Sequence, residues 1–262
     1  NDDMKFTQFL YEIQAKSLAE QRRFAKEELG MKAMFTSLNH NTKPLQTILR
    51  GTFDLVDNHT YHDHPSYPER AWSLPSAFSQ NSAIENSARV PAALMPSRVF
   101  GLPFIITEYN YCYPNRFRSE SGPLMGCYAA LQDWDAIYRF AWAHDAKKIN
   151  QPIQMEGFDI SGDPLSQLSD RITAAMFLRG DVRQATRKYA YSITASIFNE
   201  PVCNNAYPYK FAKLGLISQI GSTLNATEEQ RKQLRLFNNA GEIRPSFLNS
   251  KKDADRWEKA IG

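Results

Sequence analysis

The sequence predicts an α/β fold with parallel strands, and three observations carry that prediction. An apolar run at Phe104–Ile106, bounded by Gly101 and Pro103, is typical of a strand covered on both faces, as in a parallel sheet. Helical and strand-like segments alternate up to about residue 150, so each strand is joined to the next by a crossover. Only four such strands are found, whereas a complete (β/α)8 barrel needs eight strands and about 250 residues. We therefore expect a partial (β/α)8 barrel, or an open sheet, with a helical C-terminal extension.

The elements of the α/β part follow from periodicity and from helix-end residues. Residues 5–29 carry an apolar stripe at helical spacing and end at Gly30, a suitable C′ residue. Residues 31–38 predict a short strand, and Pro44 begins a short helix that ends near Arg50. The next expected elements are a strand at 52–57, a long Pro- and Ser-rich loop at 65–100, a strand ending on Glu108, a helix over about 121–138 and a strand at 136–142.

The C-terminal part is expected to be mostly helical. Asp163 is a good N-cap before Pro164 at the first helical position, which predicts a helix to about residue 178. Further expected elements are a helix at 182–197, an extended piece near 213–219, a helix at 228–237 capped by Thr227 and a helical last dozen residues. We expect a half barrel at 1–200 and an extension at 201–262 that could begin an accessory domain.

The composition excludes several classes of protein. The 262 residues are 42% hydrophobic, and 31 basic side chains nearly balance 28 acidic ones, so charge gives no reason to expect nucleic acid or a membrane surface as partner. There is neither a run of about 18 apolar residues nor a signal-peptide pattern. Cys112, Cys127 and Cys203 have no CxxC spacing, which favours a reducing compartment. A cytoplasmic location is therefore favoured; a periplasmic or secreted one stays open if the N-terminus is trimmed.

Polar and aromatic side chains gather at the expected strand ends, where parallel α/β folds form their reaction face. All five histidines follow an expected strand closely: His40, His59, His62, His64 and His144. Glu108 occupies the same kind of position. We expect one polar, aromatic-rich mouth lined by Glu108, Asn39, His59, Tyr61, Asn110, Tyr111, Trp142 and His144.

Two chemistries fit this mouth. In the first, Glu108 is the nucleophile of a retaining glycosidase, side chains such as His59 bind sugar hydroxyls and Trp142 stacks on a sugar ring. In the second, His59, His62 and His64 bind a divalent metal with Asp57 or Asp63. Because side chains alternate along an extended segment, the three histidines are not expected to converge, and we expect no bound metal.

Several motifs resemble one enzyme family. They are Phe9-Leu-Tyr-Glu12, Glu27-Glu-Leu-Gly-Met-Lys-Ala33, Val56-Asp-Asn-His59, His62-Asp-His-Pro65, Ile106-Thr-Glu-Tyr-Asn110, Tyr128-Ala-Ala-Leu-Gln-Asp-Trp-Asp135, Phe140-Ala-Trp142 and Phe177-Leu-Arg-Gly-Asp181. Over residues 5–190 the chain resembles uncharacterised bacterial members of the retaining (β/α)8 glycoside hydrolase clan. The resemblance implies strands five to eight of that barrel, with His59 and Tyr61 on strand six, Glu108 as the nucleophile on strand seven and Trp142 as the sugar-stacking residue on strand eight. It also implies a β-linked carbohydrate substrate and no cofactor.

The chain departs from the clan in its acid/base residue. In the clan a Glu follows an Asn at the end of strand four, but no such pair precedes Glu108, and Asn199-Glu200 lies outside the barrel pattern. Retaining hydrolysis needs two carboxyl groups about 5–5.5 Å apart, so the isolated chain is expected to be weakly active or inactive. Half a barrel exposes sheet edges and apolar faces, which predicts a homo-oligomer or a missing N-terminal half. A non-catalytic carbohydrate-binding or interaction remnant is the remaining alternative.

Overall fold

The computed structural model describes residues 2–40, 43–150, 155–194, 197–198 and 206–237 of the chain. The helices are α1 (Asp2–Arg23), α2 (Pro44–Arg50), α3 (Arg89–Leu94), α4 (Ser121–Gln132), α5 (Lys147–Asn150), α6 (Pro164–Thr173), α7 (Tyr209–Leu214) and α8 (Glu228–Gln233). The strands are β1 (Val56–His62), β2 (Phe104–Tyr111), β3 (Ala136–Arg139), β4 (Lys188–Ile193), β5 (Gln219–Leu224) and β6 (Arg235–Phe237). The π-helical turns η1 (Phe24–Glu28) and η4 (Ala174–Leu178) extend α1 and α6.

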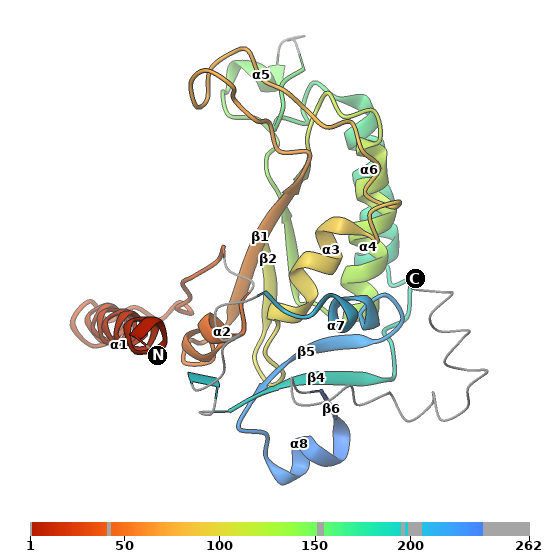
Figure 1. The fold of residues 1–262 in the computed structure, drawn as a ribbon. Coiled ribbons are helices and arrows are strands. Elements are labelled where there is room, and N and C mark those ends of the chain that lie inside the picture. The colour runs from red at the N-terminus through yellow and green to blue at the C-terminus, as the bar shows by residue number, and fades with distance from the viewer. Residues whose placement is uncertain (1, 41–42, 151–154, 195–196, 199–205, 238–262) are drawn as a thin grey trace.

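The described residues form a mixed α/β fold with two parallel sheets, which confirms the predicted class. The first sheet has the order β1–β2–β3 and the second has the order β5–β4–β6. In Figure 1, β1 and β2 rise from the base of the molecule towards α5, with α3, α4 and α6 on one side, while β4 and β5 lie across the base. The strands of the described chain do not close into a barrel.

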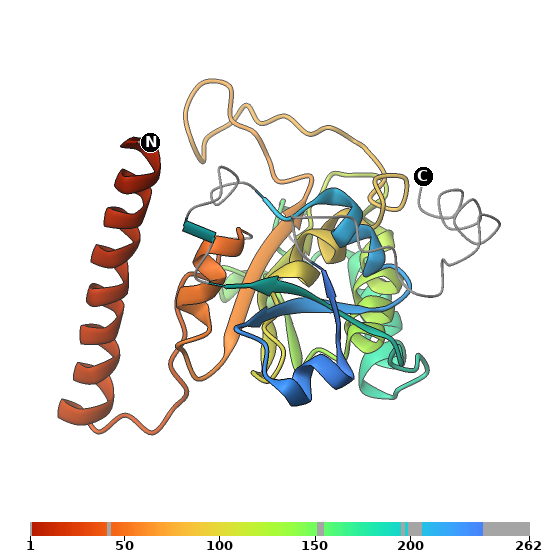
Figure 2. The ribbon, with the colours of Figure 1, turned by 60° about the horizontal axis from the view of Figure 1, so that its bottom comes forward.

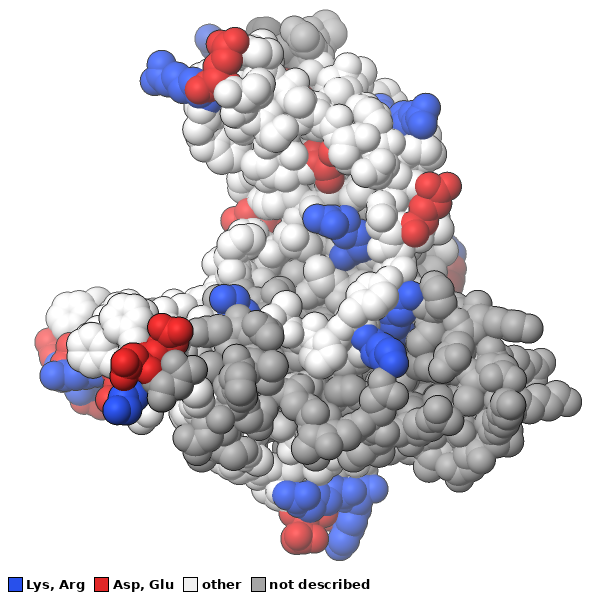
Figure 3. Space-filling model, in the orientation of Figure 1, with Lys and Arg blue, Asp and Glu red and all other residues white. Residues whose placement is uncertain are grey.

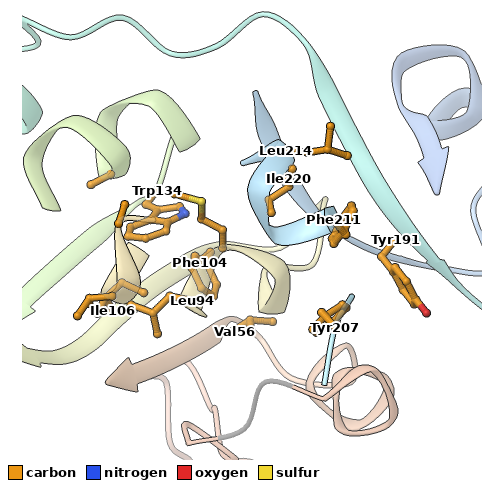
Figure 4. Packing of buried hydrophobic residues seen from close by; sticks show 14 of the residues in the cluster. Val56, Leu94, Phe104, Ile106, Trp134, Tyr191, Tyr207, Phe211, Leu214 and Ile220 are labelled. Atoms are coloured by element: carbon orange, nitrogen blue, oxygen red, sulfur yellow. The ribbon is translucent and has the colours of Figure 1, made fainter. Parts of the chain in front are cut away.

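One apolar core joins the two sheets. Val56 of β1 and Phe104 of β2 belong to the same buried cluster as Phe211 of α7 and Ile220 of β5 (Figure 4). Burying each such side chain stabilises the fold by about 1.5–3 kcal/mol. The second sheet draws β4 from before residue 200 and β5 and β6 from after it, so segments on both sides of that position fold together.

Gln132, at the end of α4, ties the first part of the core to β5. Its side chain is fully buried; its amide nitrogen donates to the carbonyls of Gly215 (2.7 Å) and Ser218 (2.6 Å), and its carbonyl accepts from the Ile220 amide (2.9 Å). These bonds satisfy backbone groups that the core would otherwise leave unpaired, which is costly.

Helices α4 and α6 approach each other closely because α4 carries glycine at the contact. A Cβ atom added at Gly122 would lie 2.1 Å from the Ser169 carbonyl oxygen, so no larger residue fits without movement. The Gly122 amide donates to the Ser169 hydroxyl at 2.6 Å. The N-terminus of α6 is capped as predicted, because the Asp163 side chain accepts from the Leu165 amide.

Helix α1 stands apart from the rest of the chain (Figure 2). The predicted helix is confirmed, but most of its apolar stripe faces outwards: Phe6 is 60% exposed and Phe9 55% exposed, and Leu10 and Ile13 are exposed as well. Only Leu18 of α1 is buried, against Leu49 and Phe53. Among the described helices, none combines the length and the apolar character needed to cross a bilayer.

Several sequence predictions of secondary structure were wrong or misplaced. The helix expected at 182–197 is replaced by β4, whose Tyr189, Ala190 and Tyr191 are buried in succession, a pattern that a buried helix and a two-sided strand share. The strand expected at 31–38 does not form; this segment is irregular and lies against the residues that precede β1, where the Asp54 amide donates to the Phe35 carbonyl. The described part of the C-terminal extension holds β5 and β6 and is therefore not purely helical.

Several boundaries also moved, among them the end of the helix expected over about 121–138, which is Gln132. The helix expected to reach residue 237 ends at Gln233, although Thr227 caps it as predicted. The strand expected at 52–57 runs instead from Val56 to His62, and the strand expected at 136–142 ends at Arg139. The last dozen residues lie outside the described part of the chain.

Candidate active site

A β-bulge in β2 sets the direction of Glu108. Asn58 of β1 pairs with Ile106, but the next residue, His59, pairs with Glu108, so Thr107 is an extra residue in β2. Side chains normally alternate between the two faces of a strand, whereas a bulge allows two successive residues to share a face. Thr107 and Glu108 do so: the Thr107 hydroxyl donates to Asp57, and Glu108 accepts from Tyr61, two residues of β1 that lie on the same face.

Glu108 is held by the hydroxyl of Tyr61. The Tyr61 hydroxyl donates a hydrogen bond to Oε2 of Glu108. Burial, reinforced by the Glu108 carboxylate, raises the pKa of Tyr61 well above its ordinary value, so the phenol stays protonated and remains a donor. The half-buried Glu108 carboxylate is thus held by one fixed hydrogen-bond donor, and carboxylates are among the side chains that can act as nucleophiles.

Two histidines continue the site beside Tyr61. The ring of His59 lies 6.2 Å from that of Tyr61 and stacks on the ring of His40 at 4.6 Å. The backbone amide of His59 donates to the carbonyl of Asn39 (2.9 Å), which brings the 31–40 segment against β1. Burial lowers the pKa of His59; the Glu108 carboxylate opposes this effect and His40 adds to it. His59 is therefore neutral near pH 7 and can both donate and accept hydrogen bonds.

A wall of aromatic rings surrounds Tyr61 on its other sides. The rings of Phe158, His64 and Phe140 lie 5.2, 5.6 and 6.2 Å from the Tyr61 ring. Phe158 and His64 both contact the ring of Trp72, at 6.2 and 5.7 Å. The wall therefore combines rings from β1, from the 65–100 loop and from the segments after β3.

Asn110 builds this wall rather than the binding surface. Its amide nitrogen donates to the carbonyls of Phe140 (2.6 Å) and Phe158 (2.8 Å), and its carbonyl accepts from Nε of Arg139 (2.9 Å) and from the Tyr111 amide (2.8 Å). The side chain is almost fully buried and all its hydrogen-bonding capacity is in use. The predicted ligand contact at Asn110 is thus replaced by a clamp on two backbone segments.

The other predicted site residues lie in three different environments: Tyr111 is buried, Trp142 is exposed and His144 is paired with Asp159. Tyr111 is buried in the core, where its ring lies 5.4 Å from that of His62, so it faces away from Glu108. Trp142 is 52% exposed and makes no aromatic ring contact within the described chain. His144 contacts the Phe140 ring at 5.1 Å and its Nδ1 is bonded to Asp159.

The strand boundaries explain one further correction. Glu108, Asn110 and Tyr111 lie within β2, and His59 and Tyr61 lie within β1, rather than beyond the ends of these strands. The apolar runs that suggested the strand ends cover only the first part of each strand. The site is therefore built on strands of a sheet, which hold side chains more rigidly than a loop does.

The histidines that suggested a metal site do not converge. His62 is buried, on the opposite face of β1 from His59, and its Nε2 is 2.8 Å from the Asn81 carbonyl. Nδ1 of His64 pairs with the carbonyl of Pro65 (2.8 Å). Within the described residues no group of three His, Cys, Asp or Glu side chains could hold a metal ion.

The carboxylates of Asp57, Asp63 and Asp159 are already engaged in hydrogen bonds or ion pairs. Asp57 accepts from the hydroxyls of Thr36 and Thr107, and Asp63 accepts from three donors on the loop side of the sheet. Asp159 is paired with His144 and Lys148. We therefore assign no acid/base residue within the part of the chain that the structure describes.

The face drawn in Figure 3 carries scattered charges of both signs rather than one charged patch. The described part of this surface thus matches the near balance of the composition. The near balance of charge in the sequence gives no electrostatic reason to expect a strongly charged ligand at a site lined by aromatic rings.

Sequence reasoning missed Trp72, Phe140 and Phe158. Trp72 is the only tryptophan in the 65–100 loop, and loops of that length usually carry function, so length and composition together were an available signal. Phe158 gave no local signal, because its place depends on a backbone hydrogen bond from Ala141 to its carbonyl (2.9 Å) and on the Asn110 clamp. Comparison of this chain with known proteins returned no matching family model, no matching curated protein and no matching solved structure.

Proposed function

We propose that this chain carries the nucleophile half of a retaining glycosidase that acts on β-linked carbohydrate, with Glu108 as the nucleophile. The observation that carries the proposal is the Tyr61–Glu108 hydrogen bond. It lies on the face of the first sheet opposite the core, beside a wall of aromatic rings. Aromatic faces suit the apolar faces of pyranose rings, and the neutral His59 beside them suits sugar hydroxyls.

The proposed chemistry follows from the position of Glu108. One carboxylate oxygen attacks the anomeric carbon and forms a glycosyl ester, while the bond to the leaving oxygen breaks and that oxygen takes the electron pair. Water then attacks the same carbon, the bond from that carbon to the carboxylate oxygen breaks, and the water's extra proton passes to the solvent, which releases the sugar and returns the carboxylate. Tyr61 orients the carboxylate in the first step and can donate to it again when it leaves.

The leaving oxygen of a natural sugar also needs a proton. General acid catalysis contributes typically 10²–10⁴-fold, and the described residues provide no acid for it. We therefore expect slow turnover of natural oligosaccharides. The engaged state of Asp57, Asp63 and Asp159 also favours one alternative, a carbohydrate-binding remnant without catalysis.

The fold supports a finer proposal. We infer that β1, β2 and β3 correspond to strands six to eight of a (β/α)8 barrel, with the segment beside β1 in the place of strand five. A separate feature concerns the partner of the chain: α1 carries an exposed apolar stripe. Its members have the spacing that allows two helices to interlock: Phe6, Phe9, Leu10 and Ile13. We propose that a second copy of the chain covers this stripe in a homodimer; the other candidate partner is a separate N-terminal half barrel.

An activated substrate tests Glu108 without the missing acid. Dinitrophenolate leaves without a proton, so dinitrophenyl β-glycosides of glucose, galactose, mannose and xylose should give a burst of dinitrophenolate as Glu108 is glycosylated. Mass spectrometry of the intact chain should show one added sugar residue. Glu108→Gln should abolish both signals, whereas Glu85→Gln, an exposed carboxylate elsewhere, should retain them.

The outcomes separate the two functions. A burst that survives in Glu108→Gln would show that Glu108 is not the nucleophile. Binding of β-linked oligosaccharides by the wild-type chain, with neither burst nor adduct from any of the four glycosides, would favour the non-catalytic remnant.

A further inference from the structure

We propose that Trp72 forms a second sugar-binding position, which stacks on a neutral pyranose unit of a β-linked oligosaccharide bound at Glu108. This inference rests on the proposed function and adds to it a residue that determines preference for chain length.

Trp72 presents a large apolar ring to solvent. The residue is 70% exposed, whereas Trp134, in the core, is 3% exposed. Leaving an indole of this size in water forgoes the stabilisation that burial brings. Tryptophan is also the residue type that most often dominates binding energy at recognition surfaces.

The backbone holds Trp72 in an unfavourable conformation. Its φ angle is +62°, in the left-handed region that bulky residues rarely adopt. Such a conformation is energetically costly and persists where the surroundings enforce it, commonly at functional sites. Glycine at position 72 would avoid this cost, so the presence of tryptophan there points to a use for the ring.

The loop that carries Trp72 is anchored at both ends. Ser66 and Ala77 exchange two backbone hydrogen bonds, of 3.0 and 2.9 Å. The Asp63 carboxylate accepts from the amides of Ser79 (2.6 Å) and Gln80 (2.9 Å). These contacts close the segment around Trp72 into a fixed loop, which reduces the entropy that a ligand would otherwise lose on ordering it.

Ring contacts connect Trp72 to the nucleophile. The Trp72 ring contacts Phe158 at 6.2 Å, Phe158 contacts Tyr61 at 5.2 Å, and Tyr61 is bonded to Glu108. Tyr67 supports the indole at 5.4 Å. Two ring contacts therefore separate Trp72 from the residue that holds Glu108, so the indole lies beside the site and not at the nucleophile itself.

The binding experiment uses the Glu108→Gln chain, so that hydrolysis does not interfere. Isothermal titration with β-linked glucose, mannose and xylose oligosaccharides, from disaccharide to hexasaccharide, identifies the sugar series that binds. Adding Trp72→Ala should weaken binding of the longer members by about tenfold and leave the disaccharide unchanged. Trp72→Tyr should recover part of the loss, because it keeps a stacking ring. Leu74→Ala is the matched control, since Leu74 lies on the same loop and is 86% exposed.

Three results would overturn the inference in different ways. Equal affinities for Trp72→Ala and its parent across all lengths would remove the second position while leaving the proposed function intact. No binding of any of these oligosaccharides by the Glu108→Gln chain would overturn the inference together with the carbohydrate function. Equal losses for the disaccharide and the longer sugars would show that Trp72 acts on the whole site, which also contradicts a separate position.

Discussion

Replacing Asn110 by alanine tests whether this residue assembles the site. The side chain makes four hydrogen bonds, with heavy-atom distances of 2.6 to 2.9 Å, to Phe140, Phe158, Arg139 and Tyr111. Each bond contributes about 1 kcal/mol net, and buried groups left unpaired cost about 1–3 kcal/mol. Because Phe140 and Phe158 are only half-buried, water can replace part of what is lost. We expect Asn110→Ala to lower the free energy of unfolding by about 3 kcal/mol.

The assay is urea unfolding followed by circular dichroism, with the burst of dinitrophenolate as the functional measurement. Asn86→Ala is the matched control, because Asn86 is exposed and its amide makes one hydrogen bond, to the Ser82 carbonyl, so its loss should cost less than about 1 kcal/mol. Asn110→Asp keeps the acceptor but removes both donors, and it should still weaken the site. A cost below about 1 kcal/mol for Asn110→Ala, similar to that of the control, would refute the clamp.

Three further predictions address the hydroxyl donor, an ion pair and the first helix. Tyr61→Phe should slow the burst by roughly 10–100-fold, as expected when a hydrogen bond to a charged group is lost, and an unchanged rate would contradict its role. Burial alone would raise the pKa of Asp163, but hydrogen bonds from Arg118 and Ser166 lower it below its ordinary value. This contribution to stability is present above about pH 4 and is lost as pH falls through the folded-state pKa, so Asp163→Asn should flatten the acid side of a stability–pH curve; an unaltered slope would count against it. The wild-type chain should sediment as a dimer and Phe9→Glu with Ile13→Glu as a monomer, because each exposed side chain gains about 1.5–3 kcal/mol when buried; a monomeric wild type would exclude self-association.

Local sequence signals predicted the elements that depend on local physics. The apolar run before Glu108 identified β2, and the cap at Asp163 identified the start of α6. The length of β1 was underestimated because its second half carries polar residues such as His59, which a strand with one polar face accommodates. The segment at β4 was assigned to a helix because a short buried run lacks the alternation that distinguishes a strand.

The site was predicted in part for a different reason. Glu108, His59 and Tyr61 come together because the adjacent parallel strands β1 and β2 present them on the same face of the sheet. The order of the elements made this foreseeable. The role of Asn110 was not foreseeable, since its two carbonyl partners lie 30 and 48 residues away in sequence. Contacts of that kind depend on how loops return to the sheet, and no local pattern records them.

Side chains alternate between the two faces of a strand, so the extra residue in β2 decides on which face the Glu108 carboxylate lies. Counting from Phe104, an even step along a regular strand would return a side chain to the core face, so residue 108 would point into the helices. The insertion at Thr107 reverses that parity for everything after it, which also turns Tyr109 and Tyr111 towards the core. Removing Thr107 would restore regular alternation and keep the carboxylate on the same face, one position earlier, whereas pairing the same residues without the bulge would turn Glu108 to the core face. A relative that lacks the insertion would carry its carboxylate one position earlier, so spacing from the apolar run, rather than the local motif alone, should guide alignment of such chains.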